Sequence, residues 1–172
     1  MRKLPNLHQP ESQRVATEVS NIQVLIGDKF PTHVIPIIEK ARYSIDILVF
    51  DWRWYPSDPH SPVQLFNQSI LRAVRRGVVV RCLANHLDIV DLLNKNGVLA
   101  RKVTTSTLIH SKLMIVDCNI SILGSHNYTA SAFSKNYESS VAITSPDVAN
   151  QFGSYFDVLF EHYGYNIPRA KV

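Results

Sequence analysis

Apolar positions along the first part of the chain follow two alternating patterns that predict strands and helices. Mainly apolar runs, which are typical of buried strands, occur at 22–26, 45–50, 78–83 and 98–103. Between these runs, apolar residues recur at the spacing of one helix face. Three helices are expected in these stretches, and they start at Pro31, at Ser61-Pro62 and at His86.

The rest of the chain adds strands that are closer together. Two strands joined by a tight turn are expected at 108–116 and 120–123, then a strand at 137–143 and a last helix from Ser145-Pro146. Strands that alternate with helices favour crossover connections and parallel pairing. The sequence therefore predicts an α/β fold, with a mixed, mostly parallel β-sheet and helices on both faces.

Residues 1–20 differ from this pattern because they are polar, aperiodic and contain two prolines. We expect them to form a polar N-terminal arm. The remaining residues, 21–172, have no linker or internal repeat and are long enough to bury one core, so they are expected to form a single domain.

Composition narrows the function classes only slightly. The chain has 18 Lys+Arg and 14 Asp+Glu, a formal net charge of +4 that is compatible with an anionic ligand. Its two cysteines form neither a disulfide framework nor a zinc site. No apolar leader or membrane span is evident, so the chain, taken as full length, is expected in the cytoplasm.

The stretch 108–127 concentrates the polar groups that can carry chemistry. Strand alternation places His110 and Lys112 on one face, and Ser125 and Asn127 share a face after the next strand. If Asp117-Cys118 is a two-residue turn, His110 lies opposite Ser125. An imidazole, an ammonium, a hydroxyl and an amide are then expected to converge at one end of a hairpin.

This set of groups suits a phosphate. Lys112 supplies positive charge, while Ser125 and Asn127 supply donors to the non-bridging oxygens. A neutral His110 has a ring nitrogen that can attack phosphorus. No carboxylate cluster lies nearby in the sequence to hold a divalent cation, so we expect chemistry without a metal or another cofactor.

The spacing His110-x-Lys112-x4-Asp117-x6-Gly124-Ser125-x-Asn127 resembles the HKD motif of the phospholipase D superfamily. Downstream, Asn136-Tyr137-Glu138 resembles the Asn-x-Glu element of that family, and the resemblance extends over residues 22–162. It implies a phospholipase D-like catalytic domain in which His110 forms a phosphohistidine. It also implies that the Glu138 carboxylate hydrogen-bonds the imidazole, while Asp117 and Gly124 serve the structure of the motif.

The family needs two such motifs per active site, and this chain has one. It resembles the single-motif bacterial Nuc-type endonucleases, which implies a homodimer with one site shared between two copies of His110. The expected substrate is DNA or RNA. Two alternatives remain: a phospholipase or phosphatidyl transferase acting on lipid head groups, and a catalytically silent member that binds nucleic acid. No residue identifies an inhibitor or a larger complex.

Several residues outside the motif have weaker functional interpretations. Trp52, Arg53 and Trp54 follow a central strand and can contact nucleic acid through base stacking and the phosphate backbone, although core packing or a dimer contact is an equal alternative. His126 occupies the variable position of the motif, and alternation assigns it to the core or the surface. Four arginines at 72, 75, 76 and 81 form a basic cluster that is either a solvated face or a phosphate contact.

Overall fold

The computed structural model describes residues 21–103, 106 and 108–165, so the expected polar arm (1–20) lies outside the described residues. An eight-stranded sheet runs through this part of the chain in the order β1-β7-β6-β5-β2-β3-β4-β8. The strands are β1 (Asn21–Ile26), β2 (Ser44–Val49), β3 (Val79–Ala84), β4 (Leu99–Val103), β5 (Leu113–Val116), β6 (Ile120–Gly124), β7 (Ser139–Thr144) and β8 (Gly164–Tyr165).

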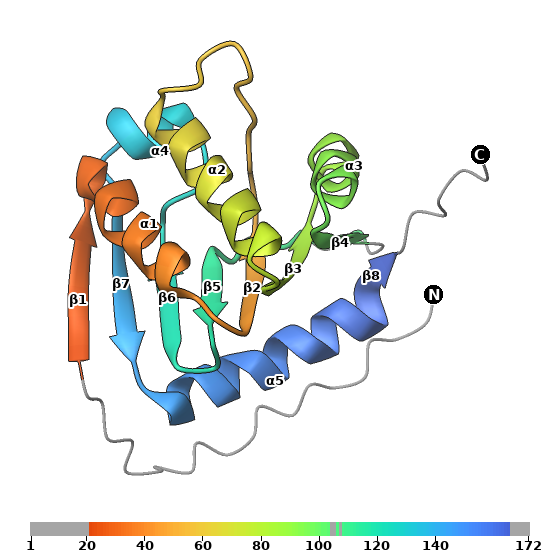
Figure 1. Cartoon of the computed structure of the whole chain (residues 1–172). Helices are drawn as coiled ribbons and strands as arrows, with labels where there is room; N and C mark the ends of the chain where they lie inside the picture. The colour runs from red at the N-terminus through yellow and green to blue at the C-terminus, as the bar shows by residue number, and fades with distance from the viewer. Residues whose placement is uncertain (1–20, 104–105, 107, 166–172) are drawn as a thin grey trace.

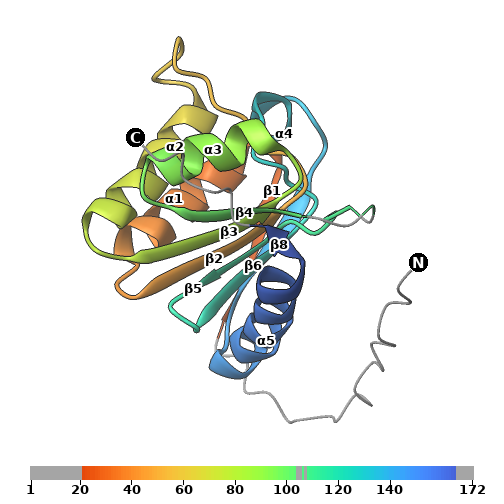
Figure 2. The ribbon, with the colours of Figure 1, turned by 90° about the vertical axis from the view of Figure 1, so that its right-hand side faces the viewer.

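Helices cover both faces of this sheet, as predicted. One face carries α1 (Phe30–Lys40), α2 (Pro62–Arg75), α3 (Leu87–Lys95) and the short α4 (Ala130–Ser134), and the other carries α5 (Pro146–Tyr163). Figure 2 shows the sheet nearly edge-on between these two layers. A larger core forms under α1–α4, and a smaller core, which includes Leu48, Leu83 and Phe156, forms under α5.

The sheet is mixed, but it has fewer parallel pairs than expected. Strand β2 pairs in parallel with β3, and β3 with β4, whereas the pairs from β2 through β5, β6 and β7 to β1 are all antiparallel. For the pair β5 and β6, the physical reason is connection length. Parallel neighbours need a long crossover, and the turn between β5 and β6 is too short to provide one. Figure 1 shows this antiparallel half beside the crossover helices.

The hairpin that carries the motif differs from the expected register. Val116 pairs with Ile120, so the turn has three residues, and both Asp117 and Cys118 have positive φ, at 52° and 50°. Residues 108–112 were expected to be strand, but β5 begins only at Leu113. The prediction that His110 pairs with Ser125 is therefore wrong, because the extra turn residue shifts the register and the ladder ends before His110.

Local sequence signals explain where the helices begin. Ser61 and Ser145 accept hydrogen bonds from the backbone N–H groups of Gln64 and Val148, both at 3.4 Å, and a proline follows each serine. Serine satisfies an otherwise unpaired donor of the first turn, and proline at the next position costs no hydrogen bond. These caps fix the starts of α2 and α5 where the sequence predicted them.

Candidate active site

The candidate site lies at one edge of the sheet, where four neighbouring strands begin or end. Strand β2 ends there, β5 begins after Lys112, β6 ends at Gly124 and β7 begins after Glu138. The backbone N–H of Gly124 donates to the carbonyl of Lys112 at 3.3 Å, which joins the two halves of the motif. The backbone of the two halves of the motif therefore meets at one end of the hairpin, although the register differs from the expected one.

His110 is exposed at this edge, and Lys112 lies beside it. The Nζ atom of Lys112 is 3.5 Å from Nε2 of His110 and donates a hydrogen bond to the His110 carbonyl at 2.8 Å. Phe50, just after β2, contacts both residues: its ring centroid lies 5.2 Å from that of His110 and 5.1 Å from Nζ of Lys112. The aromatic ring therefore supports the imidazole and attracts the ammonium.

The surroundings of Lys112 shift the pKa of its ammonium group. Partial burial lowers the pKa of Lys112, because desolvation disfavours the charged ammonium, and the carboxylate of Glu138 opposes this by raising the pKa. This electrostatic coupling links β7 to the segment before β5. Burial of Lys112 and its attraction to Glu138 thus act on the pKa in opposite directions.

Glu138 makes a different set of hydrogen bonds from the set that the resemblance implied. Its carboxylate accepts from the Ser125 hydroxyl and from Nδ2 of Asn136, the latter at 3.0 Å. Within the described part of the chain it makes no hydrogen bond to His110, so the implied imidazole contact is absent from this single copy. One carboxylate oxygen accepts from Ser125, which is 13 residues away, and the other accepts from Asn136, which is two residues away.

The side chains of Ser125 and Asn127 have different hydrogen-bond partners. The Ser125 hydroxyl donates to Glu138 and accepts from the backbone N–H of Ser139 at 3.0 Å, and one hydroxyl hydrogen cannot also be donated to a phosphate. The expected phosphate donor role of Ser125 is therefore not compatible with this bond. Oδ1 of Asn127 accepts from the backbone N–H of Asp51 at 3.2 Å, and its Nδ2 group makes no hydrogen bond to the residues that the structure describes.

Gly124 and Asp117 have the structural roles expected of them. A Cβ atom on Gly124 would collide with the Ser139 carbonyl and the Ser140 hydroxyl, so only glycine fits between β6 and β7 here. Asp117 lies at the far end of the hairpin. Its carboxylate accepts backbone N–H groups of Arg42, Tyr43 and Ser44 at 2.9, 2.7 and 3.0 Å.

Comparison with known proteins identifies the family. Residues 34–160 match the family described as "Cardiolipin synthase, PLD-like domain". The chain belongs to this family. It is 28% identical over 141 residues to the human mitochondrial cardiolipin hydrolase, in a match covering 80% of this chain and 53% of that protein. The chain thus spans about half the length of the curated relatives that it matches.

Solved structures show the same fold. A phospholipase D family member, Nuc from Salmonella typhimurium, superposes with a TM-score of 0.73 at 21% identity, covering 86% of this chain and 99% of that one. NucT from Helicobacter pylori gives a TM-score of 0.68 at 18% identity, covering 84% and 99%. The resemblance inferred from the HKD spacing is confirmed at the level of family and fold.

The aromatic loop of this PLD-like domain is mostly structural. Trp52 is 2% exposed, packs in the larger core, and donates from its indole nitrogen to Oδ1 of Asn67 at 2.7 Å. The suggested contact of Trp52 with nucleic acid is therefore wrong, because its ring is covered by protein. Trp54 packs partly against the same core. Arg53 is exposed at the surface and ion-pairs with Asp51 at 2.8 Å.

His126 belongs to the core, one of the two environments expected for it. Its ring stacks on Phe30 at 4.3 Å between centroids, and its two nitrogens contact the Ser140 hydroxyl at 2.8 Å and the Gly27 carbonyl at 3.0 Å. Burial lowers the pKa of His126, with the Gly27 carbonyl opposing the shift. The contact with Gly27 links the ring to the start of the segment that follows β1.

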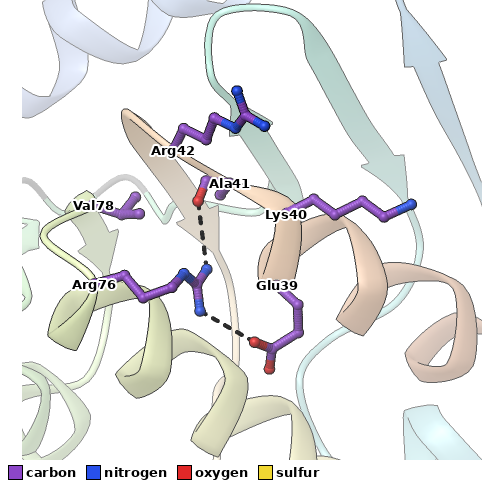
Figure 3. Close-up of a pocket in the computed structure, with 6 residues that line it drawn as sticks. All are labelled: Glu39, Lys40, Ala41, Arg42, Arg76 and Val78. Atoms are coloured by element: carbon purple, nitrogen blue, oxygen red, sulfur yellow. Dashed lines mark hydrogen bonds and ion pairs between the residues drawn. The ribbon is translucent and has the colours of Figure 1, made fainter.

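Three of the four arginines in the basic cluster form ion pairs with carboxylates. Arg72 and Arg76 bind Glu39, at 2.6 and 3.1 Å, and Arg81 binds Asp46 at 2.6 Å. A surface pocket beside Arg76 is lined by Glu39, Lys40, Ala41, Arg42, Arg76 and Val78 (Figure 3). It lies at the amino end of β2, next to the Asp117 contacts and away from the candidate active site, which is at the carboxyl end of the strand.

Two further observations concern metals and membranes. Over residues 21–103, 106 and 108–165, no group of three or more His, Cys, Asp or Glu side chains is arranged to hold a metal ion. None of the helices in the same residues is long and apolar enough to cross a bilayer.

Sequence reasoning missed two residues at this edge. Phe50 was assigned only to a buried strand, yet its ring contacts both His110 and Lys112. Asn85, directly after β3, binds the backbone next to His110. A polar residue at the carboxyl end of a central strand is the signal that could have identified Asn85.

Proposed function

We propose that this PLD-like domain is a metal-independent phosphodiesterase that acts through a phosphohistidine on His110, with DNA or RNA as its substrate. The observation that carries the proposal is an exposed imidazole beside a partly desolvated ammonium, at the edge where Asn127 also lies. The catalytic unit would be the expected single domain of residues 21–172.

In the first step, a ring nitrogen of a neutral His110 attacks phosphorus and the bond to the leaving oxygen breaks. Lys112 and Nδ2 of Asn127 are the groups that would stabilise charge on the non-bridging oxygens. Ser125, whose hydrogen is bound to Glu138, would instead fix that carboxylate near Lys112. A water then displaces the histidine from phosphorus, which regenerates the free imidazole.

The leaving oxygen needs a proton, and the attacking water must lose one. We assign both transfers to the His110 of a second copy, because the chain contains a single motif. A specific surface supports this dimer. On β1, Ile22, Val24 and Ile26 are 57%, 60% and 64% exposed, and the strand runs to the site, where Ile26 pairs with Ser139. Exposed apolar rows of this kind are typical of interfaces.

Two substrate classes have support. The net charge of +4 and the single motif favour nucleic acid, while the human relative is named a cardiolipin hydrolase, which favours a phospholipid. Both substrates present a phosphodiester to the same groups. A silent nucleic-acid-binding protein is the third candidate, and the complete set of His110, Lys112 and Asn127 argues against it.

A substrate panel in EDTA tests the proposal. Single- and double-stranded DNA, RNA, and vesicles of phosphatidylcholine or cardiolipin are incubated with the wild type, His110→Ala and the exposed control His162→Ala. We expect DNA or RNA cleavage by the wild type and the control, and a loss of at least about 10³-fold in His110→Ala. Cleavage of lipid alone would identify a phospholipid as the substrate. Cleavage that requires added Mg²⁺ would refute the metal-independent mechanism.

A further inference from the structure

Outside the motif, the side chain of Asn85 makes three hydrogen bonds to the backbone beside His110. Its Nδ2 group donates to the carbonyls of Ile109 at 2.9 Å and Phe50 at 3.1 Å, and its Oδ1 atom accepts from the N–H of Ile109 at 3.0 Å. Both ends of the amide are used, so its orientation is fixed. One residue at the end of β3 thus connects two backbone segments of the site.

These bonds matter because the sheet does not hold His110 directly. Strand β5 begins at Leu113, so His110 lies beyond the ladder of backbone hydrogen bonds. Besides the bond from Nζ of Lys112 to the His110 carbonyl, the backbone here is anchored by the buried side chain of Ile109, in the core under α5, and by the amide of Asn85. The other segment that Asn85 binds is Phe50, whose ring lies against the imidazole.

We propose that Asn85 is a positioning residue that sets the His110 imidazole relative to the Phe50 ring and Lys112. This inference rests on the proposed function, since it assigns a role in the same site. Asn85 does not touch the reacting atoms. It acts by fixing the backbone on either side of the contact between Phe50 and His110, and a displacement of the order of 1 Å in a reacting group costs about 10²-fold in rate.

The chain offers a matched control in Asn94. Its Nδ2 group donates to the carbonyl of Ala100 at 2.9 Å, and its Oδ1 atom accepts from the N–H of Ala100 at 3.1 Å. This is the same pairing of one amide with one backbone residue, but it joins α3 to β4. Replacing either asparagine by alanine removes similar bonds, and only Asn85→Ala alters the backbone next to His110.

The first experiment compares turnover. On the substrate that the wild type cleaves, kcat of Asn85→Ala is expected to fall by about 10- to 100-fold with a smaller change in KM, because attack geometry is lost while Lys112 still binds phosphate. Asn94→Ala is expected to stay within about twofold of the wild-type kcat at a temperature where all three proteins are folded. Equal kcat values for the two variants would overturn the proposal.

The second experiment needs no substrate. Amide hydrogen exchange at Ile109 is expected to accelerate in Asn85→Ala and not in Asn94→Ala, and the ring resonances of His110 are expected to shift only in the former. A wild type that cleaves no phosphodiester would refute the proposed function, while these two signals would still decide the positioning role. Unchanged exchange and unchanged His110 resonances in Asn85→Ala would refute that role.

Discussion

Replacing Asp117 tests whether this residue of the motif has a structural role, distinct from the chemical role proposed for His110 and Lys112. The carboxylate accepts three backbone N–H groups, from the two residues before β2 and from its first residue, and it lies at the opposite end of the hairpin from His110. Hydrogen bonds to a charged acceptor contribute about 1.5–3 kcal/mol each when buried. Water can replace this acceptor for Arg42 and Tyr43 at the surface, so we expect Asp117→Ala to cost about 2–4 kcal/mol in total.

For a protein of this length, 1 kcal/mol corresponds to about 2–4 °C in the melting temperature, so Asp117→Ala should lower it by roughly 5–15 °C. Asp117→Asn should cost less, because asparagine keeps one acceptor oxygen and tolerates the positive φ of 52°. Asp58→Ala is the control, since Asp58 is exposed and its side chain makes no hydrogen bond among the described residues.

Thermal unfolding and kcat, the latter measured well below the transition, are compared for the wild type and the three variants. Unchanged kcat in folded Asp117→Ala supports a structural role. The reasoning fails if Asp117→Ala melts with the wild type but has lost its activity, because the carboxylate would then act at the site.

Four further predictions follow from particular contacts. Substrate KM should rise at alkaline pH with a midpoint below the usual lysine pKa, and Glu138→Gln should move that midpoint lower, because the carboxylate raises the Lys112 pKa. The free energy of unfolding should fall as pH drops below the usual histidine pKa, since the unfolded chain binds a proton that buried His126 resists. His126→Gln should reduce this slope in a pH series of denaturant titrations. Val24→Asp should sediment as a monomer, and its activity should fall in proportion to the loss of dimer. Trp52→Ala should cost about 3–5 kcal/mol by chemical denaturation, and a cost near zero would contradict its place in the core.

Much of the fold could be predicted because apolar patterns and helix caps are local signals. The starts of α2 and α5 follow from serine and proline side chains that act on their own first turns. The sheet pairing was harder, because the choice between parallel and antiparallel neighbours depends on contacts far apart in sequence. The short α4 was missed because it is only five residues long and depends on tertiary packing.

The site could be predicted as a set of residues but not as a geometry. Spacing alone selected His110, Lys112 and Asn127, while the hydrogen-bond partners of Glu138 depend on the connection through α4 that brings β7 beside β6. Asn85 was missed because its role depends on the backbone of Ile109, 24 residues away. Its place at the carboxyl end of a central strand is a signal that could have identified it as a site residue, but not the backbone that its amide binds.

The early end of the β5 ladder explains why the motif can be both anchored and exposed. With Val116 paired to Ile120, a continued ladder would place His110 opposite His126, whose ring is buried against Phe30. The pairing instead stops at Leu113, and Ile109 enters the core under α5 while His110 stays at the surface. Backbone hydrogen bonds lost by leaving the sheet are partly replaced by Asn85. An irregular segment is therefore needed here, since a regular strand would have directed the imidazole toward the interior.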